Sequence, residues 1–239
     1  VNNGKERYTL TVEGKGSYTG KREMPWEIEK RILEIADIDF VNKAYDGTDD
    51  AVSCVTGVTF ENLPKDVTFQ KGTDYHISAA YYNRISARDA DTAYITVNLI
   101  DHYNYAFSWG GSDNQYFKTC EKTGVAIEKA EAPTVEPVEL TVVNGAAKTY
   151  TVKLPELPEL KSPCKYGETI TYSNVPTVIV DAGYYDGGAT VENGVLSLPI
   201  LANAVTQEGK IGEVKVHVTT DNYEDVILTV EIKAVNKII

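Results

Sequence analysis

The sequence predicts an all-β protein made of tandem β-sandwich-like modules in an elongated array. Three observations support this prediction: apolar residues alternate with polar ones, turn dipeptides separate the alternating runs, and tyrosine dominates the aromatic residues. Tyrosine occurs 16 times, against 5 phenylalanines and 2 tryptophans. It suits half-buried strand positions, because its ring packs on a neighbour while its hydroxyl meets water. The length of 239 residues fits one or two compact units at ~150 residues per domain.

Period-two alternation is clearest in the segment 92–100. Ala93, Ile95, Val97 and Leu99 share one face there, as a strand with one buried face requires. The pattern recurs in four other runs, at residues 75–81, 103–109, 214–218 and 226–234. Turn signals lie between the runs, at Asp46-Gly47, Gly110-Gly111, Asn144-Gly145, Gly187-Gly188 and Asn193-Gly194.

Two segments carry a helical signal. Residues 27–35 fit a short amphipathic turn, but alternating Ile38 and Phe40 follow them and a strand fits at least as well. Residues 202–207 fit one helical turn. No long helix is expected, and many short strands favour sandwich-like modules.

Proline marks the expected boundaries. The stretch 132–137 reads Ala-Pro-Thr-Val-Glu-Pro and is biased toward stiff, extended backbone, so we place a module junction there. The chain then divides into residues 1–36, 37–132 and 133–239. The first piece is too short for a module and is expected to be the C-terminal strands of a preceding module or a linker hairpin.

A tyrosine-bearing turn precedes a strand ending in isoleucine and lysine at three places. The turns are Gly16-Ser17-Tyr18, Tyr103-Asn104-Tyr105 and Asp221-Asn222-Tyr223. The strand ends are Ile28-Glu29-Lys30, Ile127-Glu128-Lys129 and Ile232-Lys233. Repeated units indicate an array of similar modules. We interpret the tyrosine as a packing peg at a sandwich corner, with its hydroxyl bonded locally, in preference to a ligand contact.

These segments resemble repeats of bacterial cell-surface proteins. Residues 43–51, Lys-Ala-Tyr-Asp-Gly-Thr-Asp-Asp-Ala, followed by Gly57-Val58, Tyr103-Asn104-Tyr105 and Ile127-Glu128-Lys129, resemble the YDG-type repeat. Residues 14–20 through Ile28-Glu29-Lys30 look like the end of an MBG-like repeat. Residues 134–236, through Glu192-Asn193-Gly194-Val195-Leu196 and the segment 219–225, resemble Ig-like modules in surface proteins of Gram-positive gut bacteria.

The resemblance implies an extracellular location on the surface of a Gram-positive bacterium. It implies a modular stalk whose partners are the neighbouring repeat modules of the same chain, or an adhesin, and it carries no catalytic residues. The stretch from Trp109 to Cys120 looks like an insertion relative to the other turn-to-strand spacings.

The charge balance narrows the choice of partners. Lysine plus arginine is 23 and aspartate plus glutamate is 35, so the net charge is −12. An acidic surface repels phosphate, which argues against nucleic acid and against anionic membrane surfaces. No apolar run approaches the ~18 residues of a membrane helix. The chain begins at Val1 without a signal peptide and reads as a piece of a longer protein.

No residue pattern nominates a catalytic, cofactor-binding or metal site, so we expect no enzyme. His76, His102 and His217 lie far apart, without metal-ligand spacing, and are expected to be solvated or hydrogen-bonded. No G-x-S-x-G, H-E-x-x-H or Walker pattern occurs. The glycines of segment 14–20 have the wrong spacing for a dinucleotide loop and predict a β-turn region.

No cofactor is expected, with calcium as the alternative at two acidic loops. One loop carries Asp46, Asp49 and Asp50, and the other carries Asp89 and Asp91. Calcium takes six to eight oxygen ligands, and carboxylates one to three residues apart supply only part of such a shell. Solvated turns are therefore preferred at both loops.

The cysteines are Cys54, Cys120 and Cys164, an odd number without C-x-x-C spacing. Buried free thiols are favoured. A Cys54–Cys120 disulfide stays open as the alternative if both lie on neighbouring strands.

Exposed aromatic residues are the candidate ligand contacts. They concentrate in the middle module, and two more lie in a glycine-rich loop of the last one; the candidates are Tyr103, Tyr105, Trp109, Tyr184 and Tyr185. Cross-strand packing is the competing interpretation. Two functions follow: a non-enzymatic stalk or spacer segment, or an adhesin-type module that binds a host glycan or protein.

Overall fold

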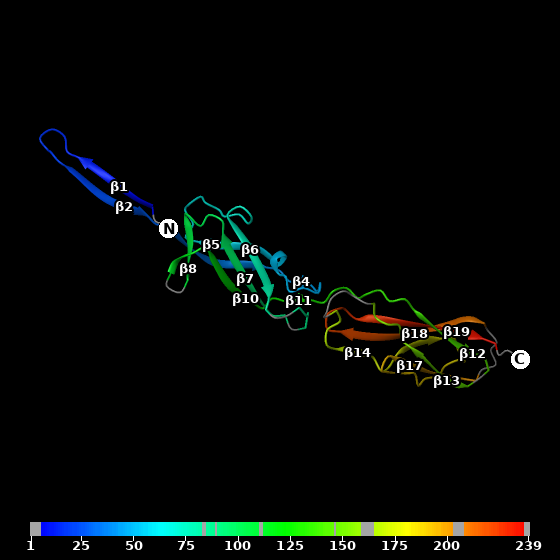
Figure 1. Cartoon of the computed structure of the whole chain (residues 1–239). Coiled ribbons are helices and arrows are strands. Elements are labelled where there is room, and N and C mark those ends of the chain that lie inside the picture. Colours follow the sequence, from blue (N-terminus) through cyan, green and yellow to red (C-terminus); the bar gives the residue numbers. More distant parts are fainter. Residues whose placement is uncertain are drawn as a thin grey trace. The chain divides into compact units, whose positions relative to one another are not determined.

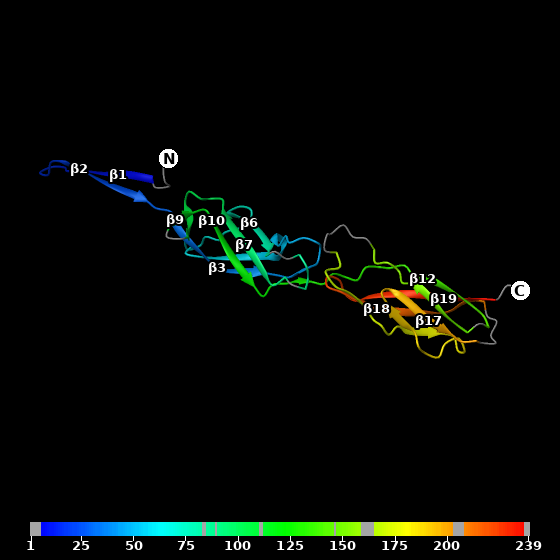
Figure 2. The same ribbon diagram turned by 60° about the horizontal axis from the view of Figure 1, so that its bottom comes forward.

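The computed structural model describes residues 6–82, 85–88, 90–109, 112–145, 147–158, 165–202 and 208–236. Within these ranges one short 3-10 turn, η1 (Val52–Cys54), is the only helical element, and strands form the rest of the regular structure (Figures 1 and 2). The predicted all-β class is confirmed. Residues 202–207, the one-turn helix candidate, lie almost wholly outside the described residues.

The chain divides into two compact units. Unit 1 comprises residues 1–43, 49–84 and 91–126, and unit 2 comprises residues 44–48, 85–90 and 127–239. The segments 44–48 and 85–90 therefore belong to unit 2, although the residues on both sides of each belong to unit 1.

Unit 1 begins with a β-hairpin. Strand β1 (Glu6–Glu13) pairs antiparallel with β2 (Lys21–Ile28), so that Tyr8 lies opposite Trp26 and Leu10 opposite Met24. The backbone N–H of Gly14 donates to the carbonyl of Gly20 at 2.9 Å and closes the connecting loop, which is the turn that the glycine spacing predicts. Every residue of β2 is exposed.

Two sheets form the body of unit 1. The first has the order β5 (Val55–Glu61), β3 (Arg31–Phe40), β8 (Tyr105–Trp109), β9 (Ser112–Gln115). The second has the order β10 (Phe117–Thr123), β7 (Thr92–Leu99), β6 (Tyr75–Tyr81). Edge-on ring contacts join the two sheets, with centroids 6.0 Å apart for Phe40–Tyr81 and 5.1 Å for Phe60–Tyr75.

The predicted alternation sets the buried faces of unit 1. Ala93, Ile95, Val97 and Leu99 are all buried, as the period-two pattern of segment 92–100 requires.

The weak helical segment 27–35 is strand, since it covers the end of β2 and the start of β3. The boundary expected after residue 36 falls inside β3. Two short strands, β4 (Lys43–Ala44) and β11 (Ile127–Glu128), pair with each other.

Unit 2 is a sandwich of two sheets. One has the order β12 (Val138–Val143), β19 (Val226–Val235), β18 (Gly209–Thr220), β14 (Ile170–Tyr172), and β15 (Thr177–Val180) also pairs with β18. The other has the order β13 (Lys148–Lys153), β17 (Val195–Ile200), β16 (Thr190–Glu192). The inward residues of both sheets form one buried apolar cluster that includes Val216, Leu228 and Leu196.

One glycine permits the pairing of β15 with β18. Gly212 has a φ of 156°, and a Cβ on it would lie 2.2 Å from the carbonyl oxygen of Ile179. It sits at the irregularity after Lys210 in the β18–β19 register and lies opposite Val180 of β15. Only glycine allows the two backbones to come this close.

The repeated turns predict the positions of the tyrosine pegs only in part. Tyr18 is 81% exposed and holds no corner. The buried pegs include Tyr81, whose hydroxyl donates to the carbonyl of Ala126 at 2.8 Å, and Tyr184, whose hydroxyl donates to Asn144 Oδ1 at 2.8 Å. Tyr105 and Tyr223 fit the prediction of a packing ring, because each is half-buried and contacts aromatic rings of its own unit.

The two described cysteines are free. Cys54 is buried and Cys120 half-buried, so the disulfide alternative between them is wrong, and Cys164 lies outside the described residues. Burial raises the pKa of the Cys120 thiol, which the charge of Lys118 only partly opposes. This thiol therefore stays protonated and behaves as a packing group.

Adjacent residues of β19 provide a test of the unit 2 core. Leu228 is buried, whereas the neighbouring Ile227 points outward. We expect Leu228→Ala to lower the free energy of unfolding of unit 2 by about 2–5 kcal/mol, because it opens a cavity. Ile227→Ala is the matched control and should lower the free energy of unfolding by well under half as much. Urea unfolding curves measure both, and equal losses would contradict the assigned strand faces.

Candidate ligand-contact surfaces

The structure separates the five predicted ligand-contact residues. Tyr103 is 75% exposed, whereas Tyr105 is half-buried and packs edge-on against Phe69 with centroids 5.0 Å apart. Trp109 ends β8, and its side chain lies outside the described residues. Of the predicted tyrosines in unit 1, Tyr103 is thus the one that offers its ring to a ligand.

The two predicted tyrosines of unit 2 serve packing. Tyr184 is 1% exposed and belongs to the apolar cluster, so the expectation of an accessible ring is corrected: a ring between two sheets cannot stack on a ligand. The half-buried Tyr185 packs against the same cluster, and its hydroxyl accepts the backbone N–H of Ala189 at 3.1 Å.

A fixed turn holds Tyr103. Asp101 Oδ1 accepts the backbone N–H groups of Tyr103 and Asn104 at 3.2 Å each, and Oδ2 accepts the Asn104 side-chain amide at 2.8 Å. Partial burial alone would raise the pKa of Asp101, but the hydrogen bonds from Asn104 and Tyr103 lower it below its ordinary value. The charged carboxylate therefore organises the turn at neutral pH.

Four aromatic rings, the first of them that of Tyr103 in this turn, contact one another in succession. Tyr103 contacts His102 with centroids 4.4 Å apart, His102 contacts Tyr116 at 6.4 Å, and Tyr116 contacts Phe117 at 5.3 Å. We call these four residues the aromatic run. Tyr116 is 55% exposed, so two large rings of the run face water. Exposed aromatic residues on a fixed turn are typical of contact surfaces.

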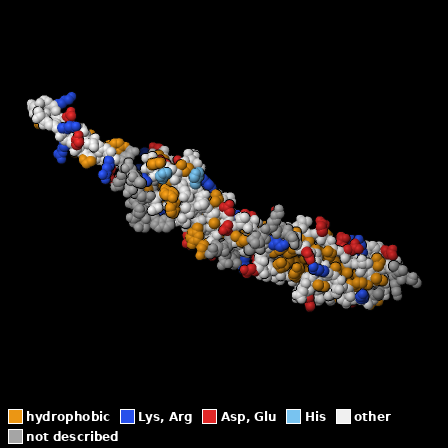
Figure 3. Space-filling model, viewed as in Figure 1, with side chains coloured by type: hydrophobic (Ala, Val, Ile, Leu, Met, Phe, Trp, Pro, Cys, Tyr) orange, Lys and Arg blue, Asp and Glu red, His pale blue; other side chains and the backbone are white. Residues whose placement is uncertain are grey.

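The aromatic run borders the outer face of the sheet β10–β7–β6. The register places Phe117, Asn98 and His76 in one row across the three strands, and Thr119, Thr96 and Ser78 in the next. Figure 3 shows hydrophobic and histidine side chains gathered over this part of unit 1.

The hairpin β1–β2 carries a second exposed surface. Its apolar face consists of half-exposed side chains, Tyr8, Leu10, Val12, Met24, Trp26 and Ile28. Tyr8 and Trp26 stack with centroids 4.7 Å apart, beside a hollow of about 470 Å³ lined by Leu10, Met24, Pro25 and Trp26. The opposite face is polar and includes an ion pair of 2.8 Å between Arg7 and Glu27.

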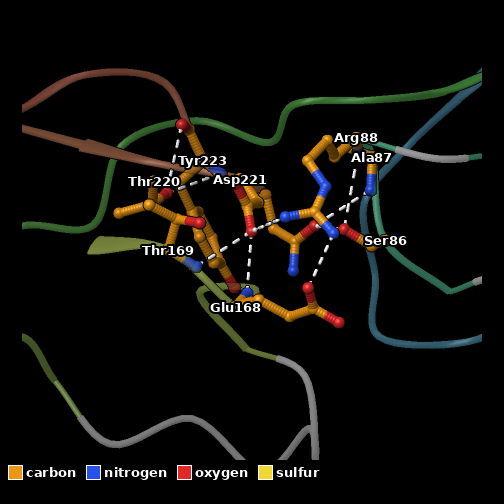
Figure 4. A network of polar contacts seen from close by, with 9 residues as sticks. Ser86, Ala87, Arg88, Glu168, Thr169, Thr220, Asp221 and Tyr223 are labelled. Carbon is orange, nitrogen blue, oxygen red and sulfur yellow. Dashed lines mark hydrogen bonds and ion pairs between the residues drawn. The ribbon is translucent and has the colours of Figure 1, made fainter. Parts of the chain in front are cut away.

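A polar cluster in unit 2 involves the segment Asp221-Asn222-Tyr223 (Figure 4). Asn222 is fully buried, and its Oδ1 accepts the hydroxyl of Ser86 at 2.8 Å and the backbone N–H of Ala87 at 2.9 Å.

The neighbouring Asp221 completes this cluster. Its Oδ2 accepts the backbone N–H groups of Glu168 at 2.7 Å and Thr169 at 3.0 Å, and pairs with Arg88 at 3.2 Å. The segment Asp221-Asn222-Tyr223 thus holds segments 85–88 and 168–169 through hydrogen bonds and an ion pair, and we call it the clasp.

The acidic loops proposed for calcium form local turns. Asp46 Oδ1 accepts the backbone N–H and the hydroxyl of Thr48 at 2.9 and 2.8 Å, and Asp50 Oδ1 accepts the N–H of Val52 at 2.9 Å. Asp89 lies outside the described residues. Across the described ranges, no group of three or more histidine, cysteine, aspartate or glutamate side chains could hold a metal ion.

The described residues also contain no helix with the length and apolar character needed to cross a membrane.

Comparisons with known proteins are sparse. No protein-family model matches the chain, and neither does a curated protein. Solved structures with similar chains include the human desmocollin-1 ectodomain (11% identity, 98% of this chain and 47% of that one, TM-score 0.30). Others are the zebrafish RET cadherin-like domains 1 to 4 (9%, 96% and 58%, 0.25) and domains 1–6 of the surface layer protein SbsC (14%, 98% and 35%, 0.21). The chain spans less than two thirds of each, and TM-scores this low support no statement about function.

The contacts of Asn222 predict that its substitution destabilises unit 2. Asn222→Ala removes the acceptor of Ser86 and Ala87 inside a buried site, so we expect unit 2 to lose about 1–3 kcal/mol of unfolding free energy. Amide exchange at Ala87 should accelerate in the same variant. Asn222→Asp keeps an acceptor oxygen and serves as the control. Unchanged exchange at Ala87 in Asn222→Ala would show that the side-chain oxygen does not hold this segment.

Proposed function

We propose that this chain is a non-enzymatic segment of a secreted bacterial cell-surface protein and acts as a spacer in a stalk of tandem modules. The resemblance to YDG-type, MBG-like and Ig-like repeats supports this proposal, and so does the acidic surface. The single observation that carries it is the parallel pairing of β12 with β19 in unit 2.

The pairing of β12 with β19 suits a unit that bears tension. These are the first and last strands of the sandwich, and six residue pairs join them in parallel, from Val138–Val230 to Val143–Val235. A pull on the two ends of such a unit loads the ladder bonds together in shear. An antiparallel pair at the ends would open one bond at a time.

Hydrogen bonds identify which donors of β12 serve the ladder. The N–H of Asn144 donates to the carbonyl of Val235 at 2.9 Å, whereas the N–H of Val143 donates to the Tyr150 hydroxyl at 2.9 Å on the other side. Because donors alternate along a strand, the N–H of Val142 faces β19 and that of Thr141 faces away.

Both units share the pairing of their entering strand, which supports an array of related modules. The N–H of Arg31 donates to the carbonyl of Asn104 at 2.8 Å, and β3 then runs parallel to β8. In unit 2 the N–H of Ala130 donates to the carbonyl of Asn222 at 3.0 Å, and Ala130 forms a parallel bridge to Tyr223. The Asn-Tyr dipeptide therefore marks where the two-sheet body of unit 1 and the sandwich of unit 2 each receive their first strand.

The partners that this proposal implies are neighbouring repeat modules of the same chain, outside the cell on a Gram-positive surface. A second candidate function is an adhesin-type module that binds a host glycan or protein. The exposed rings of the aromatic run favour it, because a spacer alone does not require them.

Single-molecule force measurements test the spacer proposal. Unit 2 should unfold in one step that releases roughly 100 residues, an extension of about 30–35 nm. Val142→Pro removes one ladder donor and should lower the unfolding force of this step, since forced unfolding follows the barrier to unfolding.

Two controls separate the ladder from the packing. Val142→Ala removes packing and keeps the donor, and Thr141→Pro changes an exposed residue whose N–H faces away from β19. Both should lower the force less than Val142→Pro does. If all three variants unfold at the wild-type force, the parallel pair bears no load and the spacer proposal loses its support.

A further inference from the structure

We propose that the outer face of the sheet β10–β7–β6, together with the aromatic run, binds an uncharged polysaccharide. This inference rests on the second proposed function, the adhesin-type module, and gives it a surface and a ligand class. It is independent of the spacer function, which depends on β12 and β19 in unit 2.

The outer face is polar along its centre. Residues of β7 that alternate with the buried face point outward, and they are Thr92, Tyr94, Thr96 and Asn98. Thr96 lies between Ser78 of β6 and Thr119 of β10 and shares a hydroxyl hydrogen bond of 2.8 Å with Thr119. Three strands thus present hydroxyl and amide groups side by side, which suits a ligand rich in hydroxyl groups.

Aromatic rings stand at both ends of this polar strip. At one end Tyr82 and Tyr94 form an edge-on pair with centroids 5.2 Å apart, and both are exposed. At the other end the aromatic run begins at Phe117, in the row of Asn98. The rows of Tyr94 and Asn98 are four residues apart, about 13 Å at ~3.3 Å per residue. Rings at this separation can stack on different sugar units of one chain.

His102 places a hydrogen-bond acceptor, its Nε2 atom, beside the exposed ring of Tyr103. Its Nδ1 lies 3.2 Å from the carbonyl oxygen of Ile100. A carbonyl oxygen only accepts, so in this contact Nδ1 carries the proton. In the neutral imidazole, Nε2 is then an acceptor, which matches a hydroxyl donor from a sugar.

The charges on this face favour an uncharged polysaccharide over a charged one. The row of Tyr94 holds two carboxylates, Glu121 opposite Tyr94 and Asp50 bridged to Ala80, and the rows of Tyr94, Thr96 and Asn98 contain no lysine or arginine. The net charge of the whole chain is −12. A sulfated or uronic acid polymer would meet repulsion and no cationic partner on this face. The threonine, serine and asparagine side chains at the centre offer hydrogen-bonding groups and little apolar area for a second sheet to cover.

The test is a titration of the full 239-residue chain, labelled with ¹⁵N, followed by amide chemical shifts. The probes are hexasaccharides of β-1,4-glucose, α-1,4-glucose, β-1,4-mannose and β-1,4-N-acetylglucosamine, with a sulfated hexasaccharide as the charged comparison. We expect at least one uncharged probe to shift amides in residues 76–82, 92–98 and 116–121. The sulfated probe should shift none of these.

Variants assign the shifts to the rings. Tyr94→Ala and Tyr103→Ala should each weaken binding about fivefold to tenfold, as expected for the loss of one stacked ring. Tyr103→Phe keeps the ring and should bind as the wild type does. Tyr8→Ala removes an exposed ring of the hairpin and is the matched control, which should leave the affinity unchanged. Amide spectra that superpose on the wild type elsewhere confirm that each variant is folded.

Three outcomes would overturn the inference. They are no shift on this face with any uncharged probe at 10 mM, stronger binding of the sulfated probe, and binding that the Tyr94 and Tyr103 variants leave intact. If a host protein shifts the same amides and the sugars do not, the adhesin function stands and the ligand class is wrong. If neither does, both fail.

Discussion

The packing of alternating apolar strand faces against a second sheet is the interaction on which both units depend. A strand with period-two alternation exposes one apolar face until another sheet covers it. Val214, Val216 and Val218 of β18 meet Leu196 and Leu198 of β17 in one cluster of unit 2. Once the inward faces are used, the outward faces and the connecting turns remain for contacts with other molecules. The candidate surfaces of this chain lie on those elements.

Much of the fold follows from local patterns in the sequence. The buried faces of residues 92–99 and 226–234 could be predicted, because the alternation is strict and each face is set by the residue's own position. The membership of segments 44–48 and 85–90 in unit 2 could not. It depends on hydrogen bonds such as Ser86 to Asn222, more than a hundred residues apart, and no local pattern encodes such a pairing.

The sequence predicted which part of the chain carries exposed aromatic residues, but not which individual rings are exposed. The tyrosine-rich middle part of the chain does carry the aromatic run, and Tyr103 is exposed as expected. Tyr184 and Tyr105 have the same residue type but point inward, and the sequence does not reveal which side of a loop faces the core. His102 and Tyr116 meet because the return from β8 through β9 to β10 brings residue 116 beside the carboxyl end of β7, where its carbonyl accepts the N–H of Leu99 at 2.8 Å.

The way segments 44–48 and 85–88 join unit 2 decides where the chain can be cut. A recombinant fragment that starts at residue 133, the junction suggested by proline, would retain both sheets of the sandwich but lose Ser86, Ala87 and Tyr45. The buried side-chain oxygen of Asn222 would then lose the two donors that it binds, and the ring of Tyr223 would lose a neighbour whose centroid now lies 5.6 Å away. The autonomous folding unit is therefore larger than the sequence module, and its missing parts come from loops that precede the junction by more than forty residues.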